Sequence, residues 1–363
     1  MGDGHVIGWD LGGAHLKAAR LEPRGRVTMA LQLPCPLWQG IPHLDDAIEK
    51  ARKALDFNGA WHAVTMTGEL ADIFSSRTVG VRTLVDRFCQ AASPTTTWVY
   101  AGPRGFIRPA QVEGFEEAIA SANWRASAEW LALRLSDGLF VDVGSTTTDL
   151  VPLRSGVAAR GTSDRERMAL EELVYTGVVR TPVMAVSARV PWEGQSIAVA
   201  SEIFATMADV YRLTAQLPEG VDVMATADGL GKSVQESAVR LARMFGADFE
   251  PDQMEQVQQC AAAIASTQLA RIEVSARLVL SRVPLPADAP VVGAGIGRFV
   301  AAQLARRLNR PFLDFADLVD ASDSVATWSA HGAPSVAVGL LLLGQRTSTL
   351  VGQATVAGAR GAL

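Results

Sequence analysis

The sequence predicts an α/β protein made of two similar halves, and three observations support this. The chain has 363 residues, which is more than one small core usually holds and fits two domains. Short apolar strands alternate with amphipathic helices along the first half, as in α/β folds. A strand, a glycine turn and a second strand occur at residues 8–21 and recur at residues 140–153.

The two hairpins share one pattern, because each has Asp-x-Gly at the end of its first strand. The aligned pairs are Asp10 with Asp142, Gly12 with Gly144, Gly13 with Ser145, and Lys17 with Asp149. A single hairpin of this kind is an ordinary β-turn that contains glycine. Two in matching register indicate a duplicated functional element.

Hydrophobic spacing and turn residues predict the elements of the first half in order. The stretch T-G-E-L-A-D is expected to begin a helix with Thr67 as its N-cap and Glu69 in its first turn. The other expected elements are an antiparallel meander of strands at 5–10, 16–21 and 27–33, strands at 61–66 and 97–100, and helices at 41–55, 82–92 and 122–135.

The second half is expected to be richer in helices. A Gly-rich stretch at 224–231 predicts a plain turn, and H-G-A-P at 331–334 predicts the start or a kink of the last helix. The expected elements are helices at 201–214, 233–244, 251–283 and 326–343, and, within 290–298, a buried strand followed by glycines that open a helix.

Composition narrows the class of partner and the compartment. A formal net charge of -5 offers no basic field, so a nucleic-acid partner is not expected. The three cysteines are far apart and form no C-x-x-C pair, which argues against zinc and favours a reducing, cytoplasmic compartment. The N-terminus shows no secretory signal, and the apolar run at 335–344 is too short to span a bilayer, so no membrane partner is expected.

Both hairpins carry the chemistry of a phosphate site. Glycine lets the turn expose several backbone N–H groups in one concavity, which binds phosphate oxygens. The aspartate that heads each turn is placed to hold Mg²⁺ or an attacking water. We therefore expect the two turns to face each other across a cleft that holds a polyphosphate and its metal. The candidate phosphate ligands are Asp10, Gly12, Gly13, Ala14, His15 and Lys17 in the first hairpin, and Gly144, Ser145, Thr146 and Thr147 in the second, with Asp10 and Asp142 as metal ligands.

A third glycine loop lies at 290–298, where a buried strand leads into a helix. Gly293, Gly295 and Gly297 resemble a dinucleotide fingerprint, and Asp314 lies about twenty residues further on, but the third glycine is misplaced for that motif. A loop that closes over a phosphate or a nucleoside fits the spacing better.

Polar residues beside the second hairpin predict a substrate-contacting segment. A Tyr, a Thr and an Arg flank a glycine turn in Y-T-G-V-V-R-T-P, where substrate contacts are expected. The charged residues that precede this stretch also fit an ordinary solvent-exposed helix with ion pairs. The candidate substrate ligands are Arg165, Glu172, Tyr175, Thr176 and Arg180, with Asp209 and Arg212 three residues apart on a predicted helix.

With all three loops placed, the pattern resembles the actin/Hsp70/sugar-kinase superfold. The stretches at 65–72, 142–149 and 171–182 are similar to the tetrahydromethanopterin-linked one-carbon-transfer proteins, within the hydantoinase/oxoprolinase-like branch. The resemblance implies a two-lobed, actin-like (ribonuclease H-like) duplicated fold with a central cleft. The implied lobes are residues 1–135 with 326–363, and residues 136–325, in which 156–214 contact the substrate.

The resemblance also implies a reaction in methanofuran or methylofuran biosynthesis. An aminomethylfuran diphosphate would be joined to the phenol oxygen of a (glutamyl)tyramine or tyrosine derivative, releasing diphosphate. The implied catalytic residues are Lys17 and Asp142, which would neutralise the leaving group with Mg²⁺, and Asp149, which would take the phenol proton. ATP or another nucleotide is compatible with the third loop but is not required.

Two other classes stay open. An ATP-dependent small-molecule kinase or amidohydrolase would use the third loop for adenosine, although Ala14 stands where many sugar kinases carry Thr or Ser. A nucleotide-binding switch without turnover is also compatible with the fold. The sequence leaves open the phenol that is used, the identity of the base, and whether the chain forms a homo-oligomer.

Overall fold

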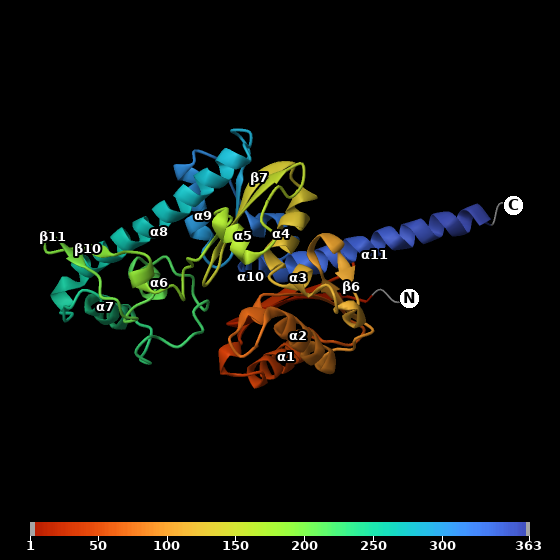
Figure 1. Ribbon diagram of the computed structural model, residues 1–363, viewed down its shortest axis with the longest axis horizontal. Helices are drawn as coiled ribbons and strands as arrows, with labels where there is room; N and C mark the ends of the chain where they lie inside the picture. Colours follow the sequence, from red (N-terminus) through yellow and green to blue (C-terminus); the bar gives the residue numbers. More distant parts are fainter. Residues whose placement is uncertain (1–3, 361–363) are drawn as a thin grey trace. The chain divides into compact units, whose positions relative to one another are not determined.

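The computed structural model describes residues 4–360, and the side chains of residues 4–346. The chain forms two compact units. The first unit comprises the residues up to Arg134 together with Ala316 and the residues after it, and the second unit runs from Leu135 to Phe315. In Figure 1 the first unit is coloured red to yellow with the blue C-terminal helices, and the second unit is coloured yellow to light blue.

The first unit contains a six-stranded sheet in the order β3-β2-β1-β4-β5-β6. Its central strand, V-I-G-W-D-L, is fully buried, as expected for a strand that is covered on both faces. β1 pairs antiparallel with β2 and parallel with β4, and β4 pairs parallel with β5. The strands are β1 Val6–Leu11, β2 His15–Leu21, β3 Val27–Pro34, β4 Trp61–Met66, β5 Thr97–Tyr100 and β6 Phe106–Ile107.

The predicted helix at T-G-E-L-A-D is wrong. Only a 3-10 turn forms at Gly68–Leu70, because the side chain of Thr67 makes no capping hydrogen bond and the chain becomes extended at Ala71 (φ -60°, ψ 137°). The next helix begins at Arg77, where the hydroxyl of Ser76 caps it, five residues before the predicted start. The helices of this part are α1 Pro42–Leu55, α2 Arg77–Ala91, α3 Glu116–Ile119 and α4 Asn123–Ala132.

Two helices, α10 Asp323–His331 and α11 Ala333–Arg360, complete the first unit. The chain bends by 101° between them, as H-G-A-P predicted. A Cβ on Gly8 would lie 1.9 Å from the carbonyl of Ser335, so glycine lets α11 pack directly on β1. Among the described residues, only this bent pair has the length and composition of a membrane span, and no single helix does.

The second unit contains a five-stranded sheet in the order β13-β12-β7-β8-β9. β7 pairs antiparallel with β8 and parallel with β12, which in turn pairs parallel with β13. The strands are β7 Asp137–Val143, β8 Thr148–Arg154, β9 Leu173–Val174, β12 Val291–Ala294 and β13 Phe312–Asp314, with a separate hairpin of β10 Arg189–Trp192 and β11 Gln195–Ala198.

The second unit differs from prediction mainly at residues 201–214. The helix α6 spans only Met207–Leu213, because Thr206 caps it and residues 201–204 before it are exposed and irregular. The predicted turn at 224–231 is confirmed as a non-helical loop. The helices are α5 Asp164–Ala169, α6 Met207–Leu213, α7 Val234–Arg243, α8 Met254–Arg282 and α9 Arg298–Arg307.

Five strands of each unit follow the same path. β1, β2, β3, β4 and β5 of the first unit correspond in order and direction to β7, β8, β9, β12 and β13 of the second. This repeated topology is the structural counterpart of the repeated hairpin sequence. The predicted α/β class is confirmed.

Candidate active site

The first glycine turn lies between β1 and β2. The N–H of Gly12 donates to the carbonyl of His15 at 3.1 Å, and a Cβ on Gly12 would lie 2.6 Å from that oxygen. Glycine is therefore required here by close backbone approach. Asp10 is buried at the end of β1, 3% exposed, and the side chains of Ala14 and His15 are also buried.

Lys17 lies directly opposite Asp10 in the β1–β2 register. Side chains of directly paired residues point to the same face of a sheet, so the ammonium and the carboxylate belong to one face. The stem of Lys17 passes Gly332, where a Cβ would lie 3.7 Å from it. The structure thus brings three predicted elements of the first hairpin, the aspartate, the turn and the lysine, to one sheet end.

The stretch after β4 supports this first turn. A Cβ on Gly68 would lie 2.9 Å from the carbonyl of Leu11, so the two loops are in close contact. The carboxylate of Glu69 is 1% exposed and accepts a hydrogen bond from Ser121 Oγ at 2.8 Å. The T-G-E stretch therefore packs against the turn and supports it. The sequence alone did not predict this contact.

The second glycine turn repeats the first. The N–H of Gly144 donates to the carbonyl of Thr147 at 2.8 Å, which matches the Gly12 to His15 bond. Asp142 and Asp149 are directly paired across β7 and β8, as Asp10 and Lys17 are across β1 and β2. Ser145 Oγ is buried and makes no hydrogen bond with another described residue, so this hydroxyl can serve a ligand.

The segment after β9 packs directly on the second turn. Val178 N–H donates to the carbonyl of Gly144 at 3.0 Å, and the N–H groups of Val179 and Arg180 donate to the carbonyl of Ser145 at 3.1 and 2.9 Å. A Cβ on Gly177 would lie 2.5 Å from the backbone of Ser145. The predicted substrate segment and the predicted phosphate turn are therefore one structural unit.

The third glycine loop reaches the same place from β12. Because β12 runs parallel to β7 with Ala294 opposite Asp142, their carboxyl ends meet. Gly295 has a φ of +82°, and a Cβ there would lie 2.4 Å from Asp142 Oδ1. The N–H of Gly297 donates to the carbonyl of Val143 at 2.8 Å, at the start of α9.

The remaining residues of that third motif have other roles. A Cβ on Gly293 would lie 2.6 Å from the ring of Phe312, so this glycine serves strand packing. Asp314 accepts a hydrogen bond from Arg298 Nε at 2.9 Å. Of the three glycines, the structure brings Gly295 and Gly297 against the second turn.

Asp149, the predicted base, forms an ion pair. Its Oδ1 accepts from Arg167 Nη1 at 2.7 Å, and Arg167 is 1% exposed. The same guanidinium donates to the carbonyl of Glu172 at 2.9 Å. A carboxylate held by a buried guanidinium is stabilised in its charged form.

The carboxylate of Glu172 is turned into the backbone. It is 2% exposed and accepts from the N–H groups of Arg160 and Gly161 at 2.7 and 3.0 Å. Arg165 is exposed on α5 and is not brought into the group around the second turn.

A buried residue that the sequence did not identify holds the substrate segment. Gln268 on α8 is fully buried, and its amide donates to Thr176 Oγ1 at 2.7 Å and to the carbonyl of Gly177 at 2.9 Å. Its amide oxygen accepts from Tyr211 Oη at 2.6 Å. The sequence did contain one signal for this role. Gln268 is a polar residue at helical spacing between Ile264 and Ile272, on the buried face of the helix.

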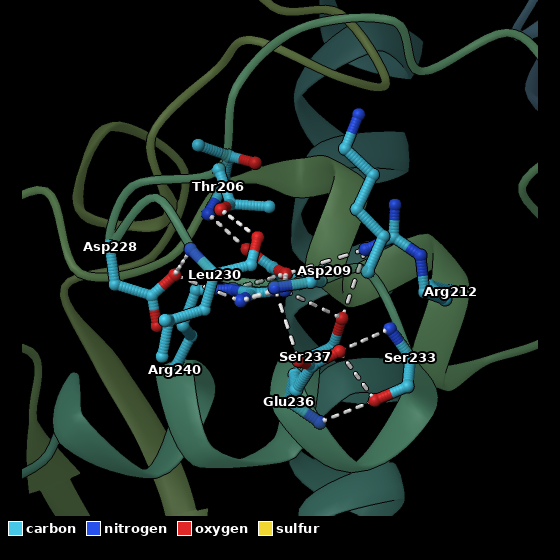
Figure 2. Close-up of polar contacts among 12 residues, drawn as sticks. Thr206, Asp209, Arg212, Asp228, Leu230, Ser233, Glu236, Ser237 and Arg240 are labelled. Atoms are coloured by element: carbon cyan, nitrogen blue, oxygen red, sulfur yellow. Dashed lines mark hydrogen bonds and ion pairs between the residues drawn. The ribbon is translucent and has the colours of Figure 1, made fainter.

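Asp209 and Arg212 lie in a larger ionic cluster, which Figure 2 shows. Arg212 lies 3.4 Å from Asp209 and pairs with Asp222 at 2.7 Å. The fully buried Arg240 of α7 donates to Asp209 at 2.9 Å and to Asp228 at 3.1 Å. The sequence identified the i,i+3 pair on α6 but not these long-range partners.

A cavity of about 180 Å³ lies beside this cluster. Tyr175, next to the turn at Gly177, is 47% exposed. The pKa of Arg180 lies below its usual value, because neighbouring atoms displace water from the guanidinium. The cavity wall consists of Val179, Arg180, Ile203, Thr206, Ala208, Asp209, Asp222, Met224, Ala225, Thr226 and Ala227.

The donors at each turn, taken separately, fit Mg²⁺ bound together with phosphate. The described residues form no group of three or more His, Cys, Asp or Glu side chains that could hold a metal alone. Mg²⁺ is usually held by one or two carboxylates and completed by substrate phosphates and water. Asp10 and Asp142, each at the head of a glycine turn, supply carboxylates of this kind, and the buried hydroxyl of Ser145 suits the phosphate.

Comparison with known proteins identifies the fold and then the family. A nucleotide-free structure of acetone carboxylase, an enzyme of ATP-dependent acetone carboxylation, matches 92% of this chain and 70% of its own, with a TM-score of 0.59 at 11% identity. The repeated strand order and this match confirm the predicted actin-like, duplicated α/β fold. Residues 61–313 match the hydantoinase/oxoprolinase family model, so the chain belongs to the hydantoinase/oxoprolinase family.

Two curated relatives carry the same name, (4-{4-[2-(gamma-L-glutamylamino)ethyl]phenoxymethyl}furan-2-yl)methanamine synthase. The protein of Methanocaldococcus jannaschii is 28% identical over 246 residues, which is 68% of this chain and 72% of that protein. The protein of Methanococcus vannielii is 33% identical over 111 residues, which is 31% of this chain and half of that protein. The family and both names indicate an enzyme, and the predicted resemblance is confirmed.

Proposed function

We propose that this protein is a transferase of methanofuran or methylofuran biosynthesis. It joins an aminomethylfuran diphosphate to the phenol oxygen of a (glutamyl)tyramine or tyrosine derivative and releases diphosphate. The observation that carries the proposal is the repeated glycine turn, closed by the same hydrogen bond at Gly12 and at Gly144 and headed each time by an aspartate. The product named for the two synthases, a phenoxymethyl furan, contains the ether that this reaction forms.

The reaction breaks the bond between the furfuryl carbon and the diphosphate oxygen. The furan ring delocalises the positive charge that develops on that carbon, so the barrier depends mainly on how well the leaving group is stabilised. In this mechanism the backbone N–H groups of both turns, Ser145 Oγ and the ammonium of Lys17 bind the diphosphate. Mg²⁺ held by Asp10 or Asp142 would supply further positive charge to the leaving group.

The phenol oxygen then forms the new bond to carbon, and its proton leaves. Attack on a furfuryl cation makes the phenol proton strongly acidic, so a weak base suffices. Asp149 is such a base, because its pairing with Arg167 favours the ionised carboxylate. Proton transfer to Asp149 or to the departing diphosphate balances the reaction.

An ATP-dependent kinase or amidohydrolase is the second candidate. The observation that favours it is the glycine loop at Gly295 and Gly297, which lies against Asp142 and Val143 and which a diphosphate-only enzyme does not require. Acetone carboxylase, whose structure has a similar fold, carboxylates acetone in an ATP-dependent reaction. In this alternative a nucleotide phosphate occupies the same turns.

Phosphorus NMR separates the two candidates. The full-length protein and Mg²⁺ are incubated with the furan diphosphate plus a phenolic amine, or with ATP plus the same amine. We expect inorganic diphosphate only when furan and phenol are both present. ADP or orthophosphate from ATP, without diphosphate from the furan, would instead support the kinase-like reaction. If neither the furan diphosphate nor ATP is consumed in any sample, the remaining interpretation is a binding protein without turnover.

A further inference from the structure

We propose that Thr65 positions the carboxylate of Asp10 when the first glycine turn binds Mg²⁺ and diphosphate. In that state the hydroxyl of Thr65 donates a hydrogen bond to one oxygen of Asp10 and leaves the other oxygen for the metal. This inference rests on the proposed function, because it concerns the same phosphate site. It gives a role to the first residue of the stretch at 65–72, which the mechanism above does not use.

Thr65 lies near the carboxyl end of β4, directly beside Asp10. β4 runs parallel to β1, and their register pairs Thr65 with Asp10 and Ala63 with Gly8. Directly paired residues point to the same face of a sheet, and neighbouring strands lie about 5 Å apart, so the hydroxyl can reach the carboxylate. Side chains alternate along a strand, and the other residues of β1 on this face, Val6 and Gly8, carry no polar side chain.

The hydroxyl of Thr65 has no use within the described part of the chain. Thr65 is fully buried, and its Oγ1 makes no hydrogen bond with any described residue. A buried hydroxyl that lacks a partner is costly, and native proteins leave few of them. Valine has nearly the same shape without the hydroxyl and is favoured in strands. The hydroxyl therefore points to a state of the protein in which it has a partner.

The same row of the sheet carries the rest of the first candidate site. Lys17 pairs with Asp10 from the other side, across β1 and β2. Lys17, Asp10 and Thr65 thus form a row across three strands, with the carboxylate between a cation and a hydroxyl donor. Carboxylates that bind a metal are commonly held by hydrogen-bond donors, which fix the orientation of the ligating oxygen. Thr65 is placed to be such a donor.

The second half of the chain does not repeat this arrangement. By the repeated topology β12 takes the place of β4, and its register sets Ala294 opposite Asp142. Alanine has no hydroxyl, and Asp142 Oδ1 lies instead against Gly295, where a Cβ would be 2.4 Å from it. A hydroxyl donor in this register therefore distinguishes the first turn from the second.

The test is a calorimetric titration of the full-length protein with inorganic diphosphate, with and without Mg²⁺. Thr65→Val, which removes the hydroxyl and keeps the shape, should weaken Mg²⁺-dependent binding by about 10–100-fold, the usual effect of losing a group that orients a metal ligand. Binding without Mg²⁺ should not change, because the backbone N–H groups and Lys17 remain. Thr65→Ser, which restores the hydroxyl, should recover most of the Mg²⁺-dependent binding.

Thermal unfolding without ligand separates positioning from a structural role. Thr65→Val should unfold at the wild-type temperature or above it, because it removes an unsatisfied hydroxyl. Thr65→Ser should unfold at a lower temperature, because it leaves a small cavity. The matched control is Thr97→Val on β5 of the same sheet, where the buried hydroxyl donates to the carbonyl of Ser93 at 2.9 Å. This control should lose stability and keep Mg²⁺-dependent binding.

A double variant shows whether Thr65 acts through Asp10. Asp10→Asn should lose most of the Mg²⁺-dependent binding. Adding Thr65→Val to Asp10→Asn should cause little further loss, because both changes disrupt one metal ligand.

Three results overturn the inference: unchanged Mg²⁺-dependent binding in Thr65→Val, equal weakening with and without Mg²⁺, or a Thr65→Val loss as large in Asp10→Asn as in the wild type. The proposed reaction is judged separately, from diphosphate release. Release from the furan substrate, together with no Mg²⁺-dependent binding by the wild type, would refute the inference and keep the reaction. Weaker Mg²⁺-dependent binding in Thr65→Val, without release from the furan substrate by the wild type, would refute the reaction and keep the role of Thr65.

Discussion

Replacing Gly177 by alanine tests whether the substrate segment positions the second glycine turn. A Cβ at this residue would lie 2.5 Å from two backbone atoms of Ser145 and Thr146, and 2.6 Å from the carbonyl oxygen of Gly144. None of these atoms belongs to a flexible side chain. Normal contact therefore requires the turn and the segment to separate by roughly 1 Å, a displacement that can cost on the order of 10²-fold in rate when it misplaces a reacting group.

The strain should also lower stability, by about 1–3 kcal/mol, as for an extra methyl group in a packed core. The assay is kcat/KM for diphosphate release, measured alongside thermal unfolding of the full-length protein. A matched control is Gly194→Ala in the β10–β11 turn, where a Cβ would meet nothing within 4 Å. The control should lose stability because φ is +74° there, but it should retain activity.

Two outcomes would refute this reasoning. Wild-type activity in a folded Gly177→Ala protein would show that the turn does not depend on this contact. An equal loss of activity in Gly194→Ala would show that the assay reports general destabilisation and not the position of the turn.

Three further predictions concern Gly295, Gln268 and His62. Gly295→Ala should reduce Mg²⁺-dependent diphosphate binding by tenfold or more, because its Cβ would lie 2.4 Å from Asp142 Oδ1, and it should also lower stability, because φ is +82° and the same Cβ would lie 2.3 Å from the carbonyl oxygen of Val143; unchanged titrations in a folded variant would contradict the loss of binding. Gln268→Leu should lower both Tm and kcat/KM, since it leaves buried donors and acceptors unsatisfied at about 1–3 kcal/mol each, whereas a fall in Tm alone would mean a purely structural role. Burial lowers the pKa of His62 to about 4, so between about pH 6.5 and 4 the unfolded chain binds more protons than the folded protein. The free energy of unfolding should therefore fall by about 3 kcal/mol as the pH falls through that window. In His62→Gln, the free energy of unfolding should depend less on pH. An identical pH profile in the two proteins would contradict the assignment to His62.

The hairpins were predictable because their determinants are local. Asp-x-Gly followed by apolar alternation defines a strand, a tight turn and a second strand within 14 residues, and the two copies confirm each other. The i,i+3 relation of Asp209 and Arg212 was equally local, and the structure shows that contact.

The errors arose where long-range contacts override local preference. Thr67 has the residue type of an N-cap, yet its side chain makes no capping hydrogen bond, and a Cβ on Gly80 of α2 would lie 2.6 Å from the carbonyl of Glu69, so this stretch packs against α2 and does not extend into a helix. Residues 201–204 have helical spacing, but the helix begins only where Thr206 can cap it.

Partners distant in sequence were out of reach for the same reason. Arg167, Arg240 and Gln268 each bind a predicted site residue, at separations of 18, 31 and 92 positions. All three are charged or polar residues in helices, and such residues are commonly exposed to solvent. Only burial, which the fold determines, shows that these three side chains face inward.

The central claim is that two glycine turns, each headed by an aspartate, bind the diphosphate of a furan substrate. The most direct measurement is a crystal structure of the full-length protein with Mg²⁺ and inorganic diphosphate. The account predicts the anion against the backbone N–H groups of residues 12–15 and 144–147, with the metal on Asp10 or Asp142. Diphosphate bound at another place, with both turns empty, would contradict it.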